Sequence, residues 1–124
     1  MKKIITLLLV VVMCFAFSGC DSRDKIRKQA DTAPVLNMST YANMREENEA
    51  RAKAEFDGKV FSYTAKVYEI NDGYCYVEGA WYMNVYLEEE DLVKLNKGDI
   101  YTFVGVFEHT VLTPNMRNAI VLDK

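Results

Sequence analysis

The stretch "VFSYTAKVYEINDGYCYV", Val60 to Val77, decides the fold, because apolar residues recur at every second position on both sides of a turn. A period of two is the spacing of side chains along a half-buried β-strand. Asn71 to Gly73 lie between the two halves and predict a tight hairpin turn, since glycine adopts positive φ at little cost. The inward face of the first half carries Phe61, Tyr63, Ala65 and Val67. The stretch therefore predicts two antiparallel strands in a mainly β domain.

Three more strands and a short helix are predicted downstream. The segment "WYMNVYLE" from Trp81 predicts a third strand, separated from the second by Gly79. "EEEDLVKLNKGD", residues 88–99, has the apolar spacing of a short helix, and Gly98 is a natural terminator. "IYTFVGVF", residues 100–107, predicts a fourth strand, and "AIVLD", residues 119–123, a short fifth after the turn-prone "TPNMRN".

Upstream, "TYANMREENEARAKAEF", residues 40–56, predicts one helix of three or four turns, because it is rich in good helix formers and has a broken apolar face. Asn43 and Glu46 have the spacing of a capping pair, although Ser39 or Thr40 could equally begin the helix. Gly58 is expected to follow its end.

A three-stranded meander, a short helix and two more strands are the order of an OB-fold, a five-stranded Greek-key barrel. The runs "NEARAKAEFDGKVFSYTAKVYEI" and "LVKLNKGDIYTFVGVF" resemble the bacterial envelope domains called tRNA_anti-like. The resemblance covers about residues 43–122 and includes a strand glycine, Gly105; Ala65 stands where such relatives often carry glycine. It implies an α+β, mainly β domain, an OB-fold barrel preceded by an N-terminal helix. The members it resembles share no established activity, so fold alone does not assign a function.

The N-terminal region has the layout of an export signal. Lys2 and Lys3 precede an apolar run over residues 4–17, which is shorter than the ~20 residues of a membrane-spanning helix. "FSGC" at residues 17–20 resembles the lipobox of bacterial lipoproteins, although Phe17 stands where leucine is usual. The resemblance implies cleavage after residue 19 and lipid attachment at Cys20, and hence a membrane-anchored protein facing outside the cytoplasm. A thiolate is nucleophilic enough for that alkylation, and two or three acyl chains anchor a protein stably.

We expect three parts along the chain: a signal at residues 1–19, a lipidated cysteine with a flexible tether at residues 20–39, and one domain at residues 40–124. The tether is predicted from mixed charge and few large apolar residues. From Arg45 onward the chain carries 9 lysines and arginines against 15 aspartates and glutamates. This acidic balance opposes nucleic-acid binding, which depends on basic contacts to phosphate.

The candidate ligand face lies on the second and third strands, where OB-folds commonly bind ligands. If Cys75 and Val77 face inward, together with Trp81, Met83, Val85 and Leu87, the outward residues are Tyr74, Tyr76, Tyr82, Asn84 and Tyr86. Tyrosines offer flat apolar area with a polar edge, suited to a protein, a peptide or a glycan. The alternative is that they cover the sheet or receive the N-terminal helix, since aromatic residues favour strands in any case.

The sequence offers no catalytic or metal-binding constellation. A nucleophile needs a base within reach and a third group that orients the base, yet the one histidine, His109, lies at the end of the fourth predicted strand beside acidic Glu108. No cysteine pair has metal-ligand spacing. Cys75 is expected to be a buried structural thiol. We therefore expect a non-enzymatic chain without a cofactor. Its function classes are an envelope binding or adaptor module, a structural or stress-linked envelope protein without a specific ligand, and single-stranded nucleic-acid binding in third place.

Overall fold

The computed structural model describes residues 22–122 and contains four helices and five strands in that part of the chain. The predicted signal and Cys20 lie outside the described residues. The helices are α2 (Ser22–Gln29), α3 (Met38–Glu47), α4 (Glu49–Phe56) and α5 (Glu89–Leu92). The strands are β1 (Val60–Ile70), β2 (Tyr74–Glu78), β3 (Tyr82–Tyr86), β4 (Ile100–Glu108) and β5 (Asn115–Leu122).

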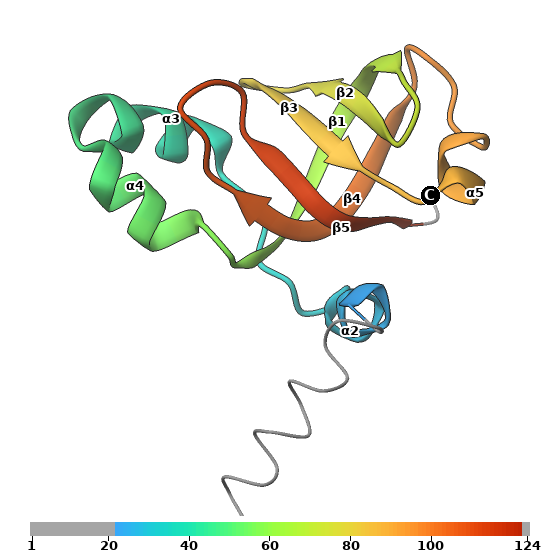
Figure 1. Cartoon of the computed structure of the whole chain (residues 1–124), viewed down its shortest axis with the longest axis horizontal. Coiled ribbons are helices and arrows are strands. Elements are labelled where there is room, and N and C mark those ends of the chain that lie inside the picture. The colour runs from blue at the N-terminus through green and yellow to red at the C-terminus, as the bar shows by residue number, and fades with distance from the viewer. Residues whose placement is uncertain (1–21, 123–124) are drawn as a thin grey trace, which may run out of the picture.

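The five strands close into a barrel in the order β1-β2-β3-β5-β4 (Figure 1). All neighbouring pairs are antiparallel except β3 and β5, which are parallel. The short helix α5 stands between β3 and β4 in the chain. This connectivity is that of a five-stranded OB-fold-like barrel, and the predicted fold class is confirmed.

The hairpin predicted at Asn71 to Gly73 is present, with Gly73 at φ +86° and β1 paired to β2. Val67 lies opposite Val77, and the register shifts between Val67 and Glu69. Such a bulge adds a residue to one strand and bends it. β1 has 11 residues and pairs with β2 at one end and with β4 at the other.

The interior of the barrel is apolar, and its two ends are closed by different helices. Tyr41 of α3 and Phe56 of α4 pack on Phe61 and Phe107 at one end. At the other end, the segment containing α5 buries two leucines against the same core. Figure 1 shows α3 and α4 on the opposite side of the barrel from α5. The fully buried residues between these ends include Val67, Cys75, Val77, Met83, Val85, Phe103, Phe107 and Met116.

The single helix expected over residues 40–56 is two helices, because Asn48 interrupts it. Asn48 has extended φ and ψ, and its side chain accepts a hydrogen bond from the Arg51 amide, which caps α4. Asn37 caps α3 in the same way through the Thr40 amide. The predictions that Asn43, Ser39 or Thr40 begins the helix are therefore wrong. The side chains of Asn37 and Asn48 accept hydrogen bonds from the free amides of the first helical turns instead. The glycine stop holds: Gly58 has φ +79°.

β5 begins at Asn115, within the segment expected to be a turn. Asn118, at φ +50°, supplies an extra residue where the β4–β5 register shifts around Gly105. A Cβ at Gly105 would lie 2.6 Å from Met116 Cγ and 2.9 Å from the Arg117 carbonyl oxygen. Asparagine tolerates this backbone conformation, so a turn-like composition here marks a bulge inside a strand.

The flexible tether expected over residues 20–39 is wrong for the described part of that segment. Ile26 of α2 is buried against Val104 and Ile120. The Arg23 guanidinium donates to the carbonyl oxygens of Ala119 and Tyr86. Residues 34–36 then run beside β1, with hydrogen bonds joining Leu36 and Pro34 to Ser62. Three buried side chains, Ile26, Leu36 and Met38, and several backbone contacts hold a segment whose average composition is polar.

Candidate functional site

The strand alternation predicted for the candidate face is observed. Cys75, Val77, Met83 and Val85 are fully buried, so the side chains between them point out of the barrel. Trp81 was expected to face inward and does not: it lies in the turn before β3 and is 40% exposed. The turn ends the alternation, because a period of two holds only inside a strand. The outward residues are Tyr74 and Tyr76 on β2, and Tyr82, Asn84 and Tyr86 on β3.

Sequence reasoning missed one member of this surface, Tyr68 of β1. Its ring meets those of Tyr76 and Tyr82 edge-on, with both centroid distances at 6.0 Å. The β1 bulge lies at this position. Alternation along β1 puts Tyr68 on the outward face, but it does not show that the Tyr68 ring lies beside β3. We call Tyr68, Tyr74, Tyr76, Tyr82, Asn84 and Tyr86 the tyrosine face.

The tyrosine face consists of two ring clusters. In the first, Tyr76 and Tyr82 stack with centroids 5.0 Å apart and planes 2° from parallel. In the second, Tyr74 and Tyr86 stack at 5.3 Å, and the Arg117 guanidinium lies 4.0 Å from the Tyr86 centroid. Much of the ring area on the face is thus used between neighbouring residues, which leaves ring edges, hydroxyls and the outermost ring surfaces for a partner.

A hollow adjoins the second cluster, beneath the loop between β4 and β5. Two of its lining residues belong to a chain of polar groups: the Asn84 amide donates to Asn115 Oδ1, and the Asn115 amide donates to Glu108 Oε1. Arg117 Nε donates to the same Glu108 oxygen. The hollow has a volume of about 400 Å³ and is lined by Asn84, Tyr86, Thr110, Val111, Leu112, Thr113 and Asn115.

The charges on the tyrosine face are mainly negative or neutralised. Glu78 beside Tyr82 raises the pKa of the Tyr82 phenol. Arg117 is paired with Glu108 at 3.2 Å. Within residues 22–122, Glu78 forms no ion pair. A polyanion approaching this face would therefore meet a negative carboxylate at one cluster and a neutralised guanidinium at the other.

The helices leave the tyrosine face open. α3 and α4 pack at the end of the barrel through Tyr41 and Phe56, and α2 lies across β4 and β5. Tyr68 and Tyr82 remain 49% and 39% exposed. Docking of the N-terminal helix, one of the two structural alternatives, therefore does not account for the tyrosines.

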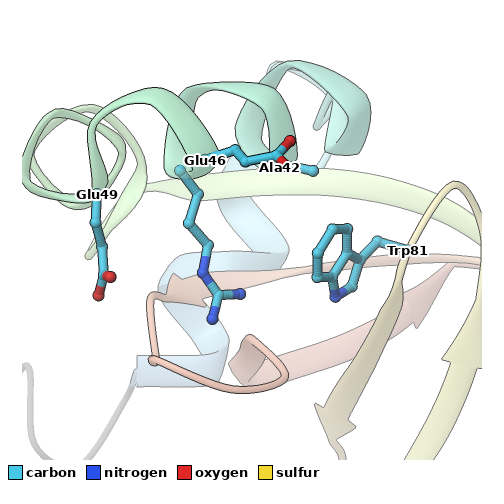
Figure 2. Close-up of a pocket in the computed structure, with 5 residues that line it drawn as sticks. Ala42, Glu46, Glu49 and Trp81 are labelled. Atoms are coloured by element: carbon cyan, nitrogen blue, oxygen red, sulfur yellow. The ribbon is translucent and has the colours of Figure 1, made fainter.

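A second hollow, of about 300 Å³, lies where α3 and the start of α4 face the turn before β3. We call it the helix–turn pocket; its lining residues are Ala42, Arg45, Glu46, Glu49 and Trp81. Figure 2 shows Glu49 and the Trp81 ring on opposite sides of it, with Glu46 and Ala42 above on the helix. Sequence analysis did not predict this pocket, because its residues are brought together only by the docking of the helices on the barrel.

His109 lies in a polar chain that the sequence did not indicate. The Tyr41 hydroxyl is 2.6 Å from His109 Nδ1, and Glu49 Oε2 is 3.2 Å from His109 Nε2. Glu108, its sequence neighbour, contacts Asn115 and Arg117 instead. The order of groups resembles a nucleophile, a base and an orienting carboxylate. However, Tyr41 is fully buried and burial raises the pKa of its phenol, so the chain links α3 and α4 to the end of β4.

Cys75 is fully buried inside the barrel, and burial raises the pKa of its thiol to about 12, which makes it a poor nucleophile. Within residues 22–122, no cluster of three or more histidine, cysteine, aspartate or glutamate side chains is arranged to hold a metal ion. In the same range, no helix is both long and apolar enough to cross a membrane.

Comparison with solved structures finds a similar barrel. A crystal structure from Klebsiella pneumoniae subsp. pneumoniae, described as a "putative nucleic acid-binding lipoprotein", superimposes with a TM-score of 0.59 at 15% sequence identity. The match covers 77% of this chain and 97% of that one. The likeness is one of fold. No known protein family matches the chain, and no curated protein matches it either.

Proposed function

We propose that this protein is a lipid-anchored, non-catalytic binding module of the cell envelope, which contacts a protein partner through the tyrosine face. The observation that carries the proposal is that five outward residues gather on β2 and β3, the strands where OB-fold barrels bind ligands, and that Tyr68 of β1 joins them. The helices within residues 22–122 pack elsewhere on the barrel. Tyrosine is enriched in protein interfaces because it combines apolar area with a hydroxyl.

A protein partner suits the arrangement of the rings better than a stacked base or sugar does. Stacking of a ligand needs an open ring face, and only the outermost ring surfaces of the two clusters remain open. Tyr86 is sandwiched between Tyr74 and the Arg117 guanidinium, and Tyr76 stacks on Tyr82. A broad surface of ring edges and hydroxyls can instead be covered by another folded surface.

The lipid anchor rests on the "FSGC" motif at residues 17–20. The structural neighbour is itself described as a lipoprotein, and that description supports the same attachment here. Fatty-acid labelling of cells tests it: the parent is expected to incorporate label and a Cys20→Ala variant to lose it. Equal labelling of both would refute the anchor.

Single-stranded nucleic-acid binding is a second candidate, because the neighbour's description names nucleic acid. The acidic balance of the domain and the pairing of Arg117 with Glu108 oppose it. Titration with labelled oligonucleotides at low and high salt separates the two proposals. Tight binding that weakens steeply with salt would support the proposal of nucleic-acid binding and contradict the proposal of a protein partner.

Photo-crosslinking in living cells tests the protein partner. Photoreactive residues at positions 68 and 82 are expected to give one discrete crosslinked band, since both side chains are strongly exposed. A probe at position 55, exposed on α4, is the matched control and is expected to give no such band. The same smear from all three positions would reduce the tyrosine face to ordinary surface and favour a spacer role for the barrel.

A further inference from the structure

The helix–turn pocket is formed by two parts of the chain, one that carries charges of both signs and one that contributes an aromatic ring. α3 and the first turn of α4 supply Arg45, Glu46 and Glu49, and the turn before β3 supplies Trp81. The volume of about 300 Å³ is that of a small-molecule site. Figure 2 shows Glu49 and the Trp81 ring on opposite sides of the pocket.

Arg45 is held in place without a carboxylate partner. Its Nη1 donates to the Leu112 carbonyl oxygen at 2.7 Å, and its Nη2 donates to the carbonyl oxygen of Val111. Its guanidinium carbon lies 5.8 Å from the Trp81 ring centroid. Within residues 22–122, no ion pair involves Arg45. Neutral carbonyls orient the guanidinium but do not neutralise it, so its positive charge is available to a bound anion.

Arg45 does not form an ion pair with either carboxylate of the pocket, Glu46 or Glu49. Arg45 and Glu49 are four positions apart, a spacing that often gives an ion pair. Here Glu49 approaches the His109 ring instead, at 3.2 Å. Glu46 forms no ion pair with any residue in the described part of the chain. Opposite charges thus line one pocket and remain separate.

We propose that the helix–turn pocket binds a free α-amino acid with an apolar side chain. The ligand carboxylate pairs with Arg45, the ligand ammonium pairs with Glu46, and the side chain lies on the exposed part of the Trp81 ring. A zwitterion is the ligand class that satisfies both signs of charge at once, whereas a simple anion or cation leaves one of them facing its own sign. This site is distinct from the tyrosine face and does not depend on lipid attachment.

Tryptophan fluorescence of the full chain in detergent tests the proposal, because Trp81 is the only tryptophan in the sequence. Leucine is expected to change the emission saturably. N-acetylleucine lacks the ammonium and leucinamide lacks the carboxylate, and each is expected to bind about tenfold more weakly or worse. Saturation-transfer NMR with leucine provides a second readout that does not require a change in emission.

Two variants assign the charges. Glu46→Gln is expected to weaken leucine binding about tenfold. The same change is not expected to weaken N-acetylleucine and should make its binding somewhat tighter, because it removes a like charge from the pocket. Glu90→Gln, on α5 at the other end of the barrel, is the matched control and is expected to bind as the parent does. The proposal is wrong if leucine gives no saturable signal in either readout, if the three compounds bind equally, or if Glu46→Gln binds leucine as tightly as Glu90→Gln.

Discussion

Cys75 shows how the apolar interior of the barrel changes the ionisation of a buried side chain. It lies on β2 with no exposed surface, opposite Val85 of β3. Burial disfavours the thiolate and raises the pKa of the thiol from 9.0 to about 12. The same burial that makes the thiol unreactive also links its proton to folding.

Cys75→Val is expected to reduce the loss of stability at alkaline pH. The folded-state pKa exceeds the unfolded one, so the contribution of Cys75 is fully present below pH 9 and declines from pH 9 toward pH 12. In that window the free energy of unfolding of the parent falls by about 1.4 kcal/mol per pH unit through this group. Urea unfolding at pH 8, 9 and 10 measures the slope for both proteins. Parallel slopes would show that the thiol titrates alike in the folded and unfolded chain.

At the scale of single residues, the sequence predicted the direction of a side chain correctly where its neighbours in the chain belong to the same strand. Alternation predicted that Cys75 and Met83 point inward, because every second side chain along a strand lies on the same face. It failed for Trp81, which the turn releases from that period. It could not find the contact between Tyr41 and His109, which are 68 positions apart and meet only when α3 closes the barrel.

At the scale of elements, α2 is the largest departure from the sequence-based prediction. Its eight residues include one large apolar side chain, Ile26, among charged ones, and composition therefore indicated a spacer. Docking depends on that single residue and on Arg23, which reaches the Tyr86 carbonyl oxygen and lies 3.7 Å from Glu88. Neither contact produces a periodic pattern in the sequence from which α2 could be predicted. The long alternation of apolar residues in β1 does produce such a pattern.

Ile26→Ala is expected to release α2 from the barrel. An isolated helix of eight residues is unstable in water, and truncation of a buried isoleucine removes about 2–5 kcal/mol of packing free energy. Hydrogen exchange measures this as loss of amide protection over residues 22–29, with protection retained in the strands. Lys25→Ala, at an exposed position of the same helix, is the control. Equal protection in the two variants would place the docking energy elsewhere.

At the scale of the whole molecule, α2 bears on how the barrel would sit on a membrane. α2 begins two residues after Cys20, a span of at most ~7 Å of extended chain. Figure 1 shows α2 below β4 and β5, with β2 on the opposite side of the barrel. If Cys20 carries lipid as proposed, the α2 side lies next to the bilayer, and the cluster of Tyr68, Tyr76 and Tyr82 is turned away from it. A flexible tether would not have given a preferred orientation.

Quenching by lipids measures this orientation in vesicles containing the lipidated protein. A fluorophore attached at position 28, exposed on α2, is expected to be quenched strongly by nitroxide-labelled headgroups, and one at position 82 weakly. Cysteine labelling is selective, because Cys75 is buried and Cys20 is blocked by the proposed lipid. A glycine–serine insertion of about 15 residues between Asp21 and Ser22 adds roughly 20 Å of flexible reach and is expected to abolish the difference. If positions 28 and 82 are quenched equally without the insertion, α2 does not orient the barrel, and the tyrosine face has no fixed direction toward its partner.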